Sequence, residues 1–556
     1  MGKIPAEYLP PSELRPHRIY TLPEYNTIPQ RLNSTEELLD KMVAAGKGDR
    51  VALYFEDKRI PYKALLAQVN KLGSALKKLG IEEADRVALR LPNIPPAIVA
   101  NFAVLKVGAV VLPTSVLFSR AEIAHVFNNA EVKAVIVAAT LLEELEKAVP
   151  ELRTVKHIIV VGGEPEEIKK KGYLLYQELL DGGDPKCDPV RRDRMDVSVL
   201  LFTSGTTGLP KGTAHFMEEA LIVPDGFGKH CWRLTEEDVL LSAAPLAMAA
   251  GYSAAATIPY RFGAALSLLP RFTPEGMFET IQNHKVTILS ALPTAYRKML
   301  QVPDAEKRYN LGSLKTCTGG GESLTAQTYL DWKAKFGQEI FEGLGTTEMM
   351  FVFISSAGTR KVKPGSIGPA IPGYELRVVT EDGKDCKPGE SGQLWGRGPT
   401  GTIYWRDPEK QRGSVKDGWC RAGDMVSMDE DGYIWFLARE DDLIKSSGYR
   451  IGPEEIEDVL VTHPSVSDAG VVGMPDPVMG QKTKAFVALK PGQQASESLK
   501  QELIEFCKGK IAVYKLPRDV EFIDQMPRAP GPGGPGTGKL LRRILRQREQ
   551  EKARTK

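Results

Sequence analysis

One stretch of the sequence joins an apolar segment directly to a loop rich in hydroxyl groups. Residues 197–202 read VSVLLF, and TSGTTGLPKG follows without a break. Glycines allow successive backbone N–H groups to turn toward one anion, while the hydroxyl groups and the lysine add donors and positive charge. A polar surface turn is the alternative, but such turns rarely place four hydroxyls, two glycines and a lysine directly after an apolar strand. The chemistry predicted is phosphate binding, by Thr203, Ser204, Gly205, Thr206, Thr207 and Lys211.

A second glycine-rich stretch lies close to the C-terminus. Residues 530–541 read PGPGGPGTGKLL, which places Gly533, Gly538 and Lys539 at the G-x-x-x-x-G-K spacing of a P-loop. A P-loop also requires a buried strand before it and a Ser or Thr after the lysine, which holds Mg²⁺. Here a Pro-rich segment comes before the loop and Leu540 follows the lysine. The sequence therefore argues against a P-loop NTPase, and Lys539 needs another explanation.

The composition is that of a globular protein with more than one domain. The chain has 556 residues, of which 42% are hydrophobic and 26% charged, and its formal net charge is +2. This length exceeds one ordinary core, and the charge balance argues against a dedicated nucleic-acid-binding protein. Six cysteines without a C-x-x-C pair predict neither a disulfide framework nor a zinc site. The N-terminus lacks an apolar signal core, and the most apolar long stretch contains Lys106, so we expect a cytoplasmic protein without a membrane span.

Short apolar runs alternate with amphipathic segments over most of the chain. RVALRLP is followed by PAIVANFAVLKVG, and AVIVAA is followed by TLLEELEKAV. This alternation predicts an α/β fold with largely parallel sheets flanked by helices. After about residue 436 a charged stretch leads into a helix, two strands, a helix and a strand, which predicts a small α+β domain. We place the two domains at residues 1–438 and 439–556, with a terminal helix that packs through Leu540, Leu541, Ile544 and Leu545.

The segment TSGTTGLPKG resembles the signature loop of the adenylate-forming superfamily. This superfamily includes acyl- and aryl-CoA synthetases, peptide-synthetase adenylation domains and beetle luciferases. Four more segments resemble its motifs in the expected order: GGGESL (319–324), GLGTTE (343–348), GWCRAGD (418–424) and AREDDLIKSSGYRI (438–451). The resemblance covers nearly the whole chain. It implies a large N-terminal domain with the ATP and carboxylate sites, and a small, mobile C-terminal domain that acts as a lid.

The resemblance also implies a nucleotide site beyond the phosphate loop. A lone Glu348 beside Thr347 suits Mg²⁺, which takes only one or two carboxylates from a protein. Without the motif, Glu348 would read as a solvated surface charge, Asp424 as a turn residue and Arg439 as part of an exposed linker. The adenine, phosphate and ribose contacts of ATP and AMP are assigned to Gly320, Gly321, Glu322, Gly343, Leu344, Gly345, Thr346, Asp424 and Arg439.

Lys539 finds its explanation in the same family. There a lysine in a Pro-Arg-Thr-x-x-Gly-Lys context swings over the active site, and this chain keeps the two ends of that motif but inserts a longer Pro-Gly tract. The resemblance implies that Lys539 offsets charge developing between the carboxylate and the α-phosphate, and that Asp441 is the hinge. The catalytic residues implied are Lys539, Thr347, Glu348 and Lys211. Ser446, Ser447 and Gly448 fall where relatives pass the CoA pantetheine, although small turn residues explain them almost as well.

Two segments narrow the resemblance to benzoate– and aminobenzoate–CoA ligases. They are FEGLGTTEMMFVFISS and the N-terminal YNTIPQRLNSTEELLDKMVAAGKGDRVAL. Those ligases carry His three residues after the motif Glu, where this chain has Phe351, and their aromatic-rich segment is here PLAMAAGYSAAA, with Ala247, Ala249 and Ala250. These changes predict a wider, more apolar acyl pocket, unless other residues refill the space. The hypothesis is a bulkier aryl, alicyclic or medium-chain acid.

The implied function is that of an AMP-forming acid–thiol ligase. A carboxylate attacks the α-phosphate of ATP to give an acyl-adenylate and pyrophosphate, and the C-terminal domain then rotates so that the CoA thiol releases AMP. ATP, Mg²⁺ and coenzyme A are the cofactors expected, with a small carboxylate as substrate, and a homodimer would be in keeping with the family. The alternatives are an adenylating enzyme that loads a carrier protein, a luciferase-like oxygenase and a catalytically silent nucleotide-binding homologue.

Overall fold

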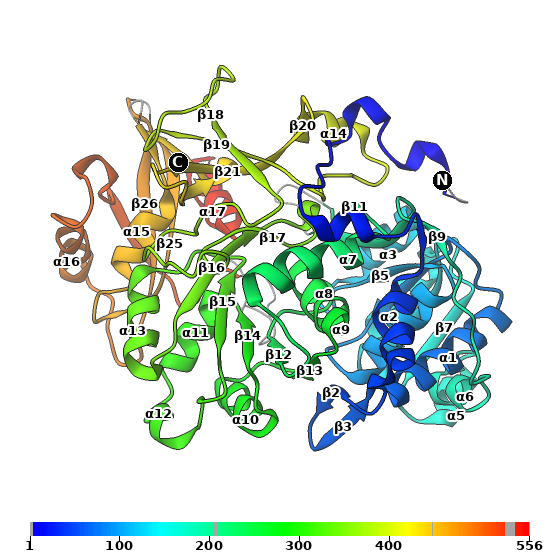
Figure 1. Cartoon of the computed structure of the whole chain (residues 1–556). Coiled ribbons are helices and arrows are strands. Elements are labelled where there is room, and N and C mark those ends of the chain that lie inside the picture. The colour runs from blue at the N-terminus through cyan, green and yellow to red at the C-terminus, as the bar shows by residue number, and fades with distance from the viewer. Residues whose placement is uncertain (1–3, 204–208, 447–448, 477, 529–539, 555–556) are drawn as a thin grey trace.

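The computed structural model describes residues 4–203, 209–446, 449–476, 478–528 and 540–554. In these residues two large sheets, three layers of helices, two five-stranded sheets and one two-stranded sheet make up the fold (Figure 1). The C-terminal part, orange and red in Figure 1, lies beside the second large sheet and away from the first. No described helix is long and apolar enough to cross a membrane.

The first large sheet has seven strands in the order β11-β10-β5-β4-β6-β7-β8. The pairs from β10 to β8 are parallel, and β11 runs antiparallel at the edge. Residues of β4 are buried on both faces, with Val87 and Leu89 in one core and Ala88 in another, as expected for a covered parallel sheet. The strands are β4 (Arg86–Arg90), β5 (Val110–Pro113), β6 (Val132–Ala138), β7 (His157–Val161), β8 (Leu174–Leu175), β10 (Val197–Thr203) and β11 (Lys211–Phe216).

The second large sheet has eight strands in the order β17-β16-β15-β14-β12-β13-β2-β3. Its interior pairs are parallel, and the pairs at both edges are antiparallel. The carboxyl ends of β15 and β16 therefore lie side by side, which is where open α/β sheets bind ligands. The strands are β2 (Val51–Phe55), β3 (Lys58–Pro61), β12 (Val239–Ser242), β13 (Ala265–Leu268), β14 (Ile288–Ala291), β15 (Thr316–Gly320), β16 (Ile340–Gly345) and β17 (Val352–Ser355).

Helices cover both faces of each large sheet. The helices between the sheets share one core with both of them: α1 (Tyr62–Lys78), α2 (Pro95–Lys106), α8 (Ala249–Ala256) and α9 (Ile258–Phe262). The outer face of the first sheet is covered by α3 (Arg120–Ala130) and α4 (Leu142–Ala148). The outer face of the second is covered by α10 (Pro274–His284), α11 (Pro293–Leu300) and α13 (Ala326–Phe336). The predicted α/β class with largely parallel sheets is confirmed.

A five-stranded antiparallel sheet follows and carries the GWCRAGD segment. In its register Asp424 and Arg439 are direct partners on neighbouring strands. Our domain boundary after residue 438 falls at the end of this sheet and remains a prediction. The strands are β18 (Glu375–Val379), β19 (Ser391–Arg397), β20 (Val415–Lys416), β21 (Trp419–Met428) and β22 (Ile434–Arg439).

The last sheet lies wholly in the C-terminal part. Its strands are β23 (Ile444–Ser446), β24 (Tyr449–Ile451), β25 (Val466–Asp476), β26 (Gly480–Leu489) and β27 (Asp519–Phe522). One face packs against α15 (Pro453–Leu460) and α16 (Glu497–Cys507), and the other against α17 (Arg542–Arg554). The predicted order of helix, two strands, helix and strand is confirmed.

The prediction for the terminal helix was partly wrong. Leu545 is 2% exposed and packs on the last sheet, whereas Ile544 is 41% exposed. Neighbouring residues of a helix point about 100° apart, so a helix that meets the sheet along one narrow stripe buries only one of the two. Leu540 and Leu541 come before α17 begins.

Candidate active site

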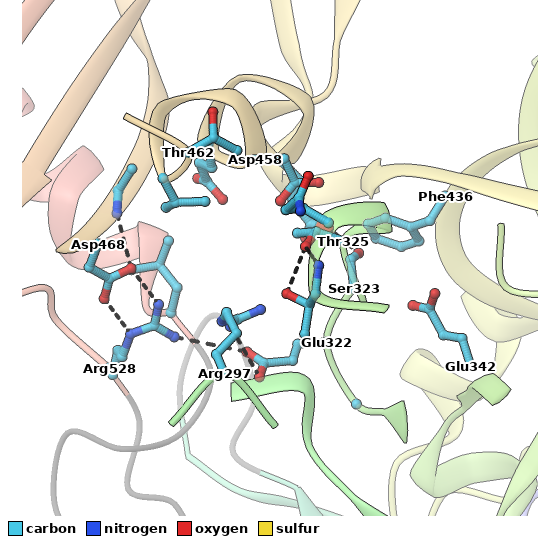
Figure 2. Close-up of a pocket in the computed structure, with 18 of the residues that line it drawn as sticks. Arg297, Glu322, Ser323, Thr325, Glu342, Phe436, Asp458, Thr462, Asp468 and Arg528 are labelled. Atoms are coloured by element: carbon cyan, nitrogen blue, oxygen red, sulfur yellow. Dashed lines mark hydrogen bonds and ion pairs between the residues drawn. The ribbon is translucent and has the colours of Figure 1, made fainter. Parts of the chain in front are cut away.

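A cavity of about 1100 Å³ lies between the second large sheet and the C-terminal part. Figure 2 shows side chains of both parts facing this space. The ends of β15 and β16 form one wall, together with β21 and β22, and residues of α15, β25 and the region around α17 form the other. Seven residues of the predicted nucleotide site line it: Gly321, Glu322, Gly343, Leu344, Gly345, Asp424 and Arg439.

Glycines keep the strand ends at this cavity free of side chains. Gly320 and Gly343 are partners in the parallel register of β15 and β16, and a Cβ on Gly320 would lie 2.7 Å from the carbonyl oxygen of Gly343. A Cβ on Gly343 would lie 2.9 Å from Val352 Cγ1, and Gly321 has a φ of +88°. Only glycine satisfies both the close approach and the left-handed backbone. The result is a bare backbone surface at the wall of the cavity.

An ion pair between Asp424 and Arg439 stands at the wall of the cavity. Arg439 Nη1 donates to Asp424 Oδ1 at 2.8 Å, and Asp424 is only 3% exposed. The carboxylate holds the pKa of Arg439 above its usual value. The cavity wall therefore carries a buried carboxylate, a group that accepts hydrogen bonds from hydroxyl groups.

Glu348 lies in a short turn that follows β16. The 3-10 turn η9 (Thr347–Met349) is capped by Thr346, whose Oγ1 accepts a hydrogen bond from the backbone N–H of Met349 at 3.2 Å. Tyr404 donates its hydroxyl proton to Glu348 Oε1 at 2.7 Å; burial and this carboxylate raise the pKa of Tyr404. No group of three or more His, Cys, Asp or Glu able to hold a metal occurs in the part of the chain that the structure describes. One carboxylate fits Mg²⁺ that is held mainly by phosphates and water.

Two described residues at the ends of the predicted phosphate loop are partners in the first large sheet. Thr203 ends β10 and is the antiparallel partner of Lys211, the first residue of β11. Ser446 ends β23, is 3% exposed and is partnered with Gly480. The remaining predicted residues lie outside the described part of the chain: Ser204, Gly205, Thr206, Thr207, Ser447, Gly448 and Lys539.

The segments on either side of the Pro-Gly tract are paired with each other. Arg528 and Leu540 form an antiparallel bridge, and the backbone N–H of Leu541 donates to the carbonyl of Pro527 at 2.8 Å. Leu540, the residue directly after Lys539, lines the cavity. Leu540, the first described residue after the tract, is therefore held at the cavity.

Phe351 packs in a cluster of aromatic side chains. It is 5% exposed, and its ring lies edge-on to Phe227 at 4.9 Å and to Trp232 at 5.8 Å between centroids. Ser253 of α8 donates to the carbonyl of Met350 at 3.1 Å, which fixes α8 beside this segment. This hydrogen bond brings α8 beside the segment that carries Phe351, and their common role in an acyl pocket stays a prediction.

The three alanines of the predicted acyl pocket differ in exposure. Ala249 is buried, Ala247 is half-buried and Ala250 is exposed at the start of α8. Among the described residues, neither these alanines nor Phe351 lines the cavity of the nucleotide site. The described residues that we predict for the acyl pocket thus lie outside the lining of this cavity, and their assignment stays a prediction.

Comparison with known proteins identifies the family. The family model "AMP-binding enzyme" matches residues 41–405, and "AMP-binding enzyme C-terminal domain" matches residues 455–530. The chain belongs to the AMP-binding enzyme family. It is 33% identical to the benzoate–CoA ligase of Thauera aromatica, over 93% of this chain and 96% of that protein. It is also 33% identical to the acetyl-coenzyme A synthetase of Bacillus subtilis, over 93% and 90%.

Solved structures agree with this assignment. An anthranilate CoA ligase in complex with anthranoyl-AMP superposes with a TM-score of 0.88 at 30% identity, covering 95% of this chain and 99% of that one. A benzoate CoA ligase from Burkholderia xenovorans superposes with a TM-score of 0.82 at 29% identity, covering 93% and 100%. The fold of this AMP-binding enzyme is therefore that of an aryl-CoA ligase.

Sequence reasoning missed a buried carboxyl group in this AMP-binding enzyme. Glu342 is 6% exposed, lines the cavity and accepts a hydrogen bond from the backbone N–H of Leu324 at 2.8 Å. Burial raises the pKa of Glu342 well above its usual value, and the nearby acids Glu454 and Asp458 add to this effect. Its place directly before the GLGTTE segment was the signal available in the sequence.

The AMP-binding enzyme also has a contact between its two parts that no motif indicated. Arg528 donates through Nε and Nη2 to Asp468, both at 2.8 Å, and its Nη1 lies 3.9 Å from Glu322 Oε2. Figure 2 shows Arg528 between these two carboxylates. Glu322 also accepts the backbone N–H of Thr294 at 2.6 Å and lies 3.5 Å from Arg297. The carboxylate of Glu322 therefore faces the C-terminal part.

Proposed function

We propose that this chain joins a carboxylic acid bulkier than benzoate to coenzyme A. The chain is a carboxylate–CoA ligase of the AMP-forming type: it converts an acid and ATP into an acyl-adenylate and pyrophosphate, and then transfers the acyl group to coenzyme A. ATP and coenzyme A are its co-substrates, and Mg²⁺ is the usual partner of ATP. The observation that supports the nucleotide half of this reaction is the cavity where bare glycine strand ends meet the Asp424–Arg439 pair.

Seven of the predicted residues have a role in nucleotide binding in this proposal. The adenine base lies on the backbone of Gly320, Gly321 and Gly343, and Asp424 accepts hydrogen bonds from the ribose hydroxyls. Thr203 and Lys211 present the phosphate loop, and Glu348 holds Mg²⁺, which neutralises phosphate charge. The backbone placement of the glycines supports the first of these roles, and the burial of Asp424 supports the second.

Lys539 and the hinge act on the chemical steps. Lys539 stabilises the charge that develops as the acid oxygen bonds to the α-phosphorus and pyrophosphate leaves. The pairing of Arg528 with Leu540 supports this role, because it holds the residue after Lys539 at the cavity. The C-terminal part then rotates about Asp441, so that the thiol of coenzyme A can approach the acyl-adenylate.

The acid is proposed from small side chains in the predicted acyl pocket. Ala247, Ala249 and Ala250 stand where aryl-CoA ligases of the resembled group have aromatic bulk, and Phe351 replaces a polar ring. Each extra buried methylene contributes about 0.8 kcal/mol, or about fourfold in affinity. A pocket with room for several carbons would therefore favour an alicyclic, larger aryl or medium-chain acid strongly over benzoate.

Competition between acids tests the proposal. We would measure kcat/KM for benzoate, cyclohexanecarboxylate, phenylpropanoate and octanoate in the unchanged enzyme and in Ala250→Tyr, with Ala250→Ser as the matched control. The tyrosine should lower kcat/KM for the bulky acids at least tenfold relative to benzoate, because about two methylenes of space correspond to this factor, and KM for ATP should not change. Preference of the unchanged enzyme for benzoate would refute the assignment of the acid.

Assembly and location complete the proposal. We infer a homodimer by analogy with the family alone, and a cytoplasmic location from six scattered cysteines that predict no disulfide framework. Light scattering of the purified chain at micromolar concentration decides between one copy and two.

A further inference from the structure

Contacts on the N-terminal side of Asp441 fasten the chain to the small antiparallel sheet. Arg439 donates to Asp424 of β21 at 2.8 Å. Glu440, the next residue, accepts a hydrogen bond from Gln393 Nε2 of β19 at 2.8 Å. The chain is thus bound to two different strands of the same sheet immediately before Asp441.

Contacts on the C-terminal side fasten the next residue to a different unit. Arg546 Nη1 donates to Asp442 Oδ1 at 2.6 Å, and Arg542 Nη1 donates to Asp442 Oδ2 at 3.3 Å. Both arginines belong to α17. Arg542 is 5% exposed and also donates to Glu457 of α15 at 2.5 and 2.9 Å. Asp442 is therefore joined to α15 and α17 of the C-terminal part.

Only a very short segment remains between these two fastened units. The 3-10 turn η10 (Glu440–Asp442) has its first residue bound to one unit and its last residue bound to the other. Hinges in proteins are a few terminal or loop residues that absorb the change in φ and ψ. A rotation at this turn would be taken up between the contacts of Glu440 and those of Asp442, where Asp441 lies.

We propose that Arg546, with Arg542, is a positioning residue that confines the rotation to Asp441. The pair of arginines, together with Asp442, is called the hinge clamp below. By holding Asp442 against α17, the hinge clamp keeps the start of α17 at a fixed distance from the pivot. This inference rests on the domain rotation proposed above, and it adds Arg542 and Arg546, which lie 100 and 104 positions after Asp442 in the sequence.

The hinge clamp should affect the chemical step more than the binding of ATP. Leu540, two residues before α17, lines the cavity. A pivot spread over several residues would let this end of the chain adopt many orientations, of which only a fraction is productive. The predicted ATP contacts up to Asp424 lie in the N-terminal domain, and Arg439 is held by Asp424 of that domain rather than by the hinge clamp. Loss of the clamp should therefore lower kcat and leave KM for ATP nearly unchanged.

The test compares variants of one helix in the full chain. Arg546→Gln removes the ion pair with Asp442, Arg546→Lys keeps the charge, and Arg543→Gln is the matched control, because Arg543 is an exposed residue of the same helix. Arg546→Gln should lower the single-turnover rate of pyrophosphate release about fivefold to tenfold, equivalent to about 1–1.4 kcal/mol in the barrier. KM for ATP should stay within about twofold, Arg546→Lys should retain most of the rate, and Arg543→Gln should match the unchanged enzyme.

Hydrogen exchange gives a second readout that does not need activity. The backbone N–H of Leu443 donates to the carbonyl of Arg439 at 3.1 Å across the turn, so exchange at residues 442–444 reports how well the turn is held. Exchange there should be faster in Arg546→Gln than in Arg543→Gln, while the melting temperature stays the same. The double variant Asp442→Arg with Arg546→Asp should restore slow exchange.

Each outcome distinguishes the hinge clamp from the proposed function. Equal rates and equal exchange in Arg546→Gln and Arg543→Gln would overturn the clamp. A lower melting temperature with an unchanged rate would show a merely structural contact and would also overturn it. If the unchanged chain releases no pyrophosphate with any acid, the proposed function fails, and the exchange comparison still decides whether the clamp holds the turn.

Discussion

Replacing Asp424 by asparagine should weaken ATP binding through the ribose. Asp424 is 3% exposed and paired with Arg439 at 2.8 Å, so Asp424→Asn keeps the shape of the side chain and removes a buried charge. A hydrogen bond to a charged group contributes about 1.5–3 kcal/mol. The dissociation constant for ATP should therefore rise about 10- to 150-fold. The fold should survive, because Arg439 is partly exposed and can turn its guanidinium toward water.

Arg439→Gln is the matched control for this prediction. It breaks the same ion pair but keeps the carboxylate, so ATP affinity should fall much less than in Asp424→Asn. Calorimetric titration with ATP and with 2′-deoxy-ATP provides the assay. The unchanged enzyme should prefer ATP, and Asp424→Asn should lose most of that preference, because the charged acceptor of the hydroxyl proton becomes a neutral amide oxygen. An Asp424→Asn variant that discriminates between the two nucleotides as strongly as the unchanged enzyme would show that Asp424 does not contact the ribose.

Three further changes test other parts of the site. Lys539→Ala should slow acyl-adenylate formation about 100- to 1000-fold, which is the loss typical of removing one charge-stabilising donor. Transfer from a supplied acyl-adenylate to coenzyme A should keep its rate. Equal losses in both steps would contradict this role. Burial and neighbouring acids raise the pKa of Asp458 from 3.8 to about 7, so the folded state binds this proton more tightly and stability falls as pH rises through that window. Asp458→Asn should lose less stability than the unchanged chain between pH 5 and pH 8 in thermal melts, and an identical pH slope would count against the shift. A Cβ on Gly345 would lie 2.5 Å from the carbonyl oxygen of Phe351, so Gly345→Ala should cost about 1–3 kcal/mol in urea unfolding, whereas Gly413→Ala, with nothing within 4 Å, should cost almost nothing.

Some helices and strands could be predicted because the pattern of their own residues determines their conformation and burial. The stretch around Lys106 is apolar on every side, which predicts a buried helix, and α2 and β5 are buried as expected. The sequence alone does not determine which face of the terminal helix packs against the sheet. The adjacent Ile544 and Leu545 are both apolar, and only the position of the last sheet decides that Leu545 is the buried one.

Candidate site residues that lie within one sequence motif could be predicted. Contacts between segments far apart in the sequence could not. The glycines at 320 and 343 were found as motifs, but their contact depends on the parallel register of two strands. Arg528 and Asp468 are 60 residues apart, and Arg546 and Asp442 are 104 apart. Charged residues at such separations follow no periodic pattern, so their pairing appears only once the chain has folded.

Pyrophosphate release with a panel of acids tests directly whether the chain is an AMP-forming carboxylate–CoA ligase. Mg-ATP would be supplied with each of several carboxylates, from acetate to decanoate and including aryl and alicyclic acids, with and without coenzyme A. We expect pyrophosphate release that depends on an acid, with AMP and an acyl-CoA appearing when coenzyme A is present. Release of inorganic phosphate without any acid, or an acyl group that never reaches coenzyme A, would contradict it.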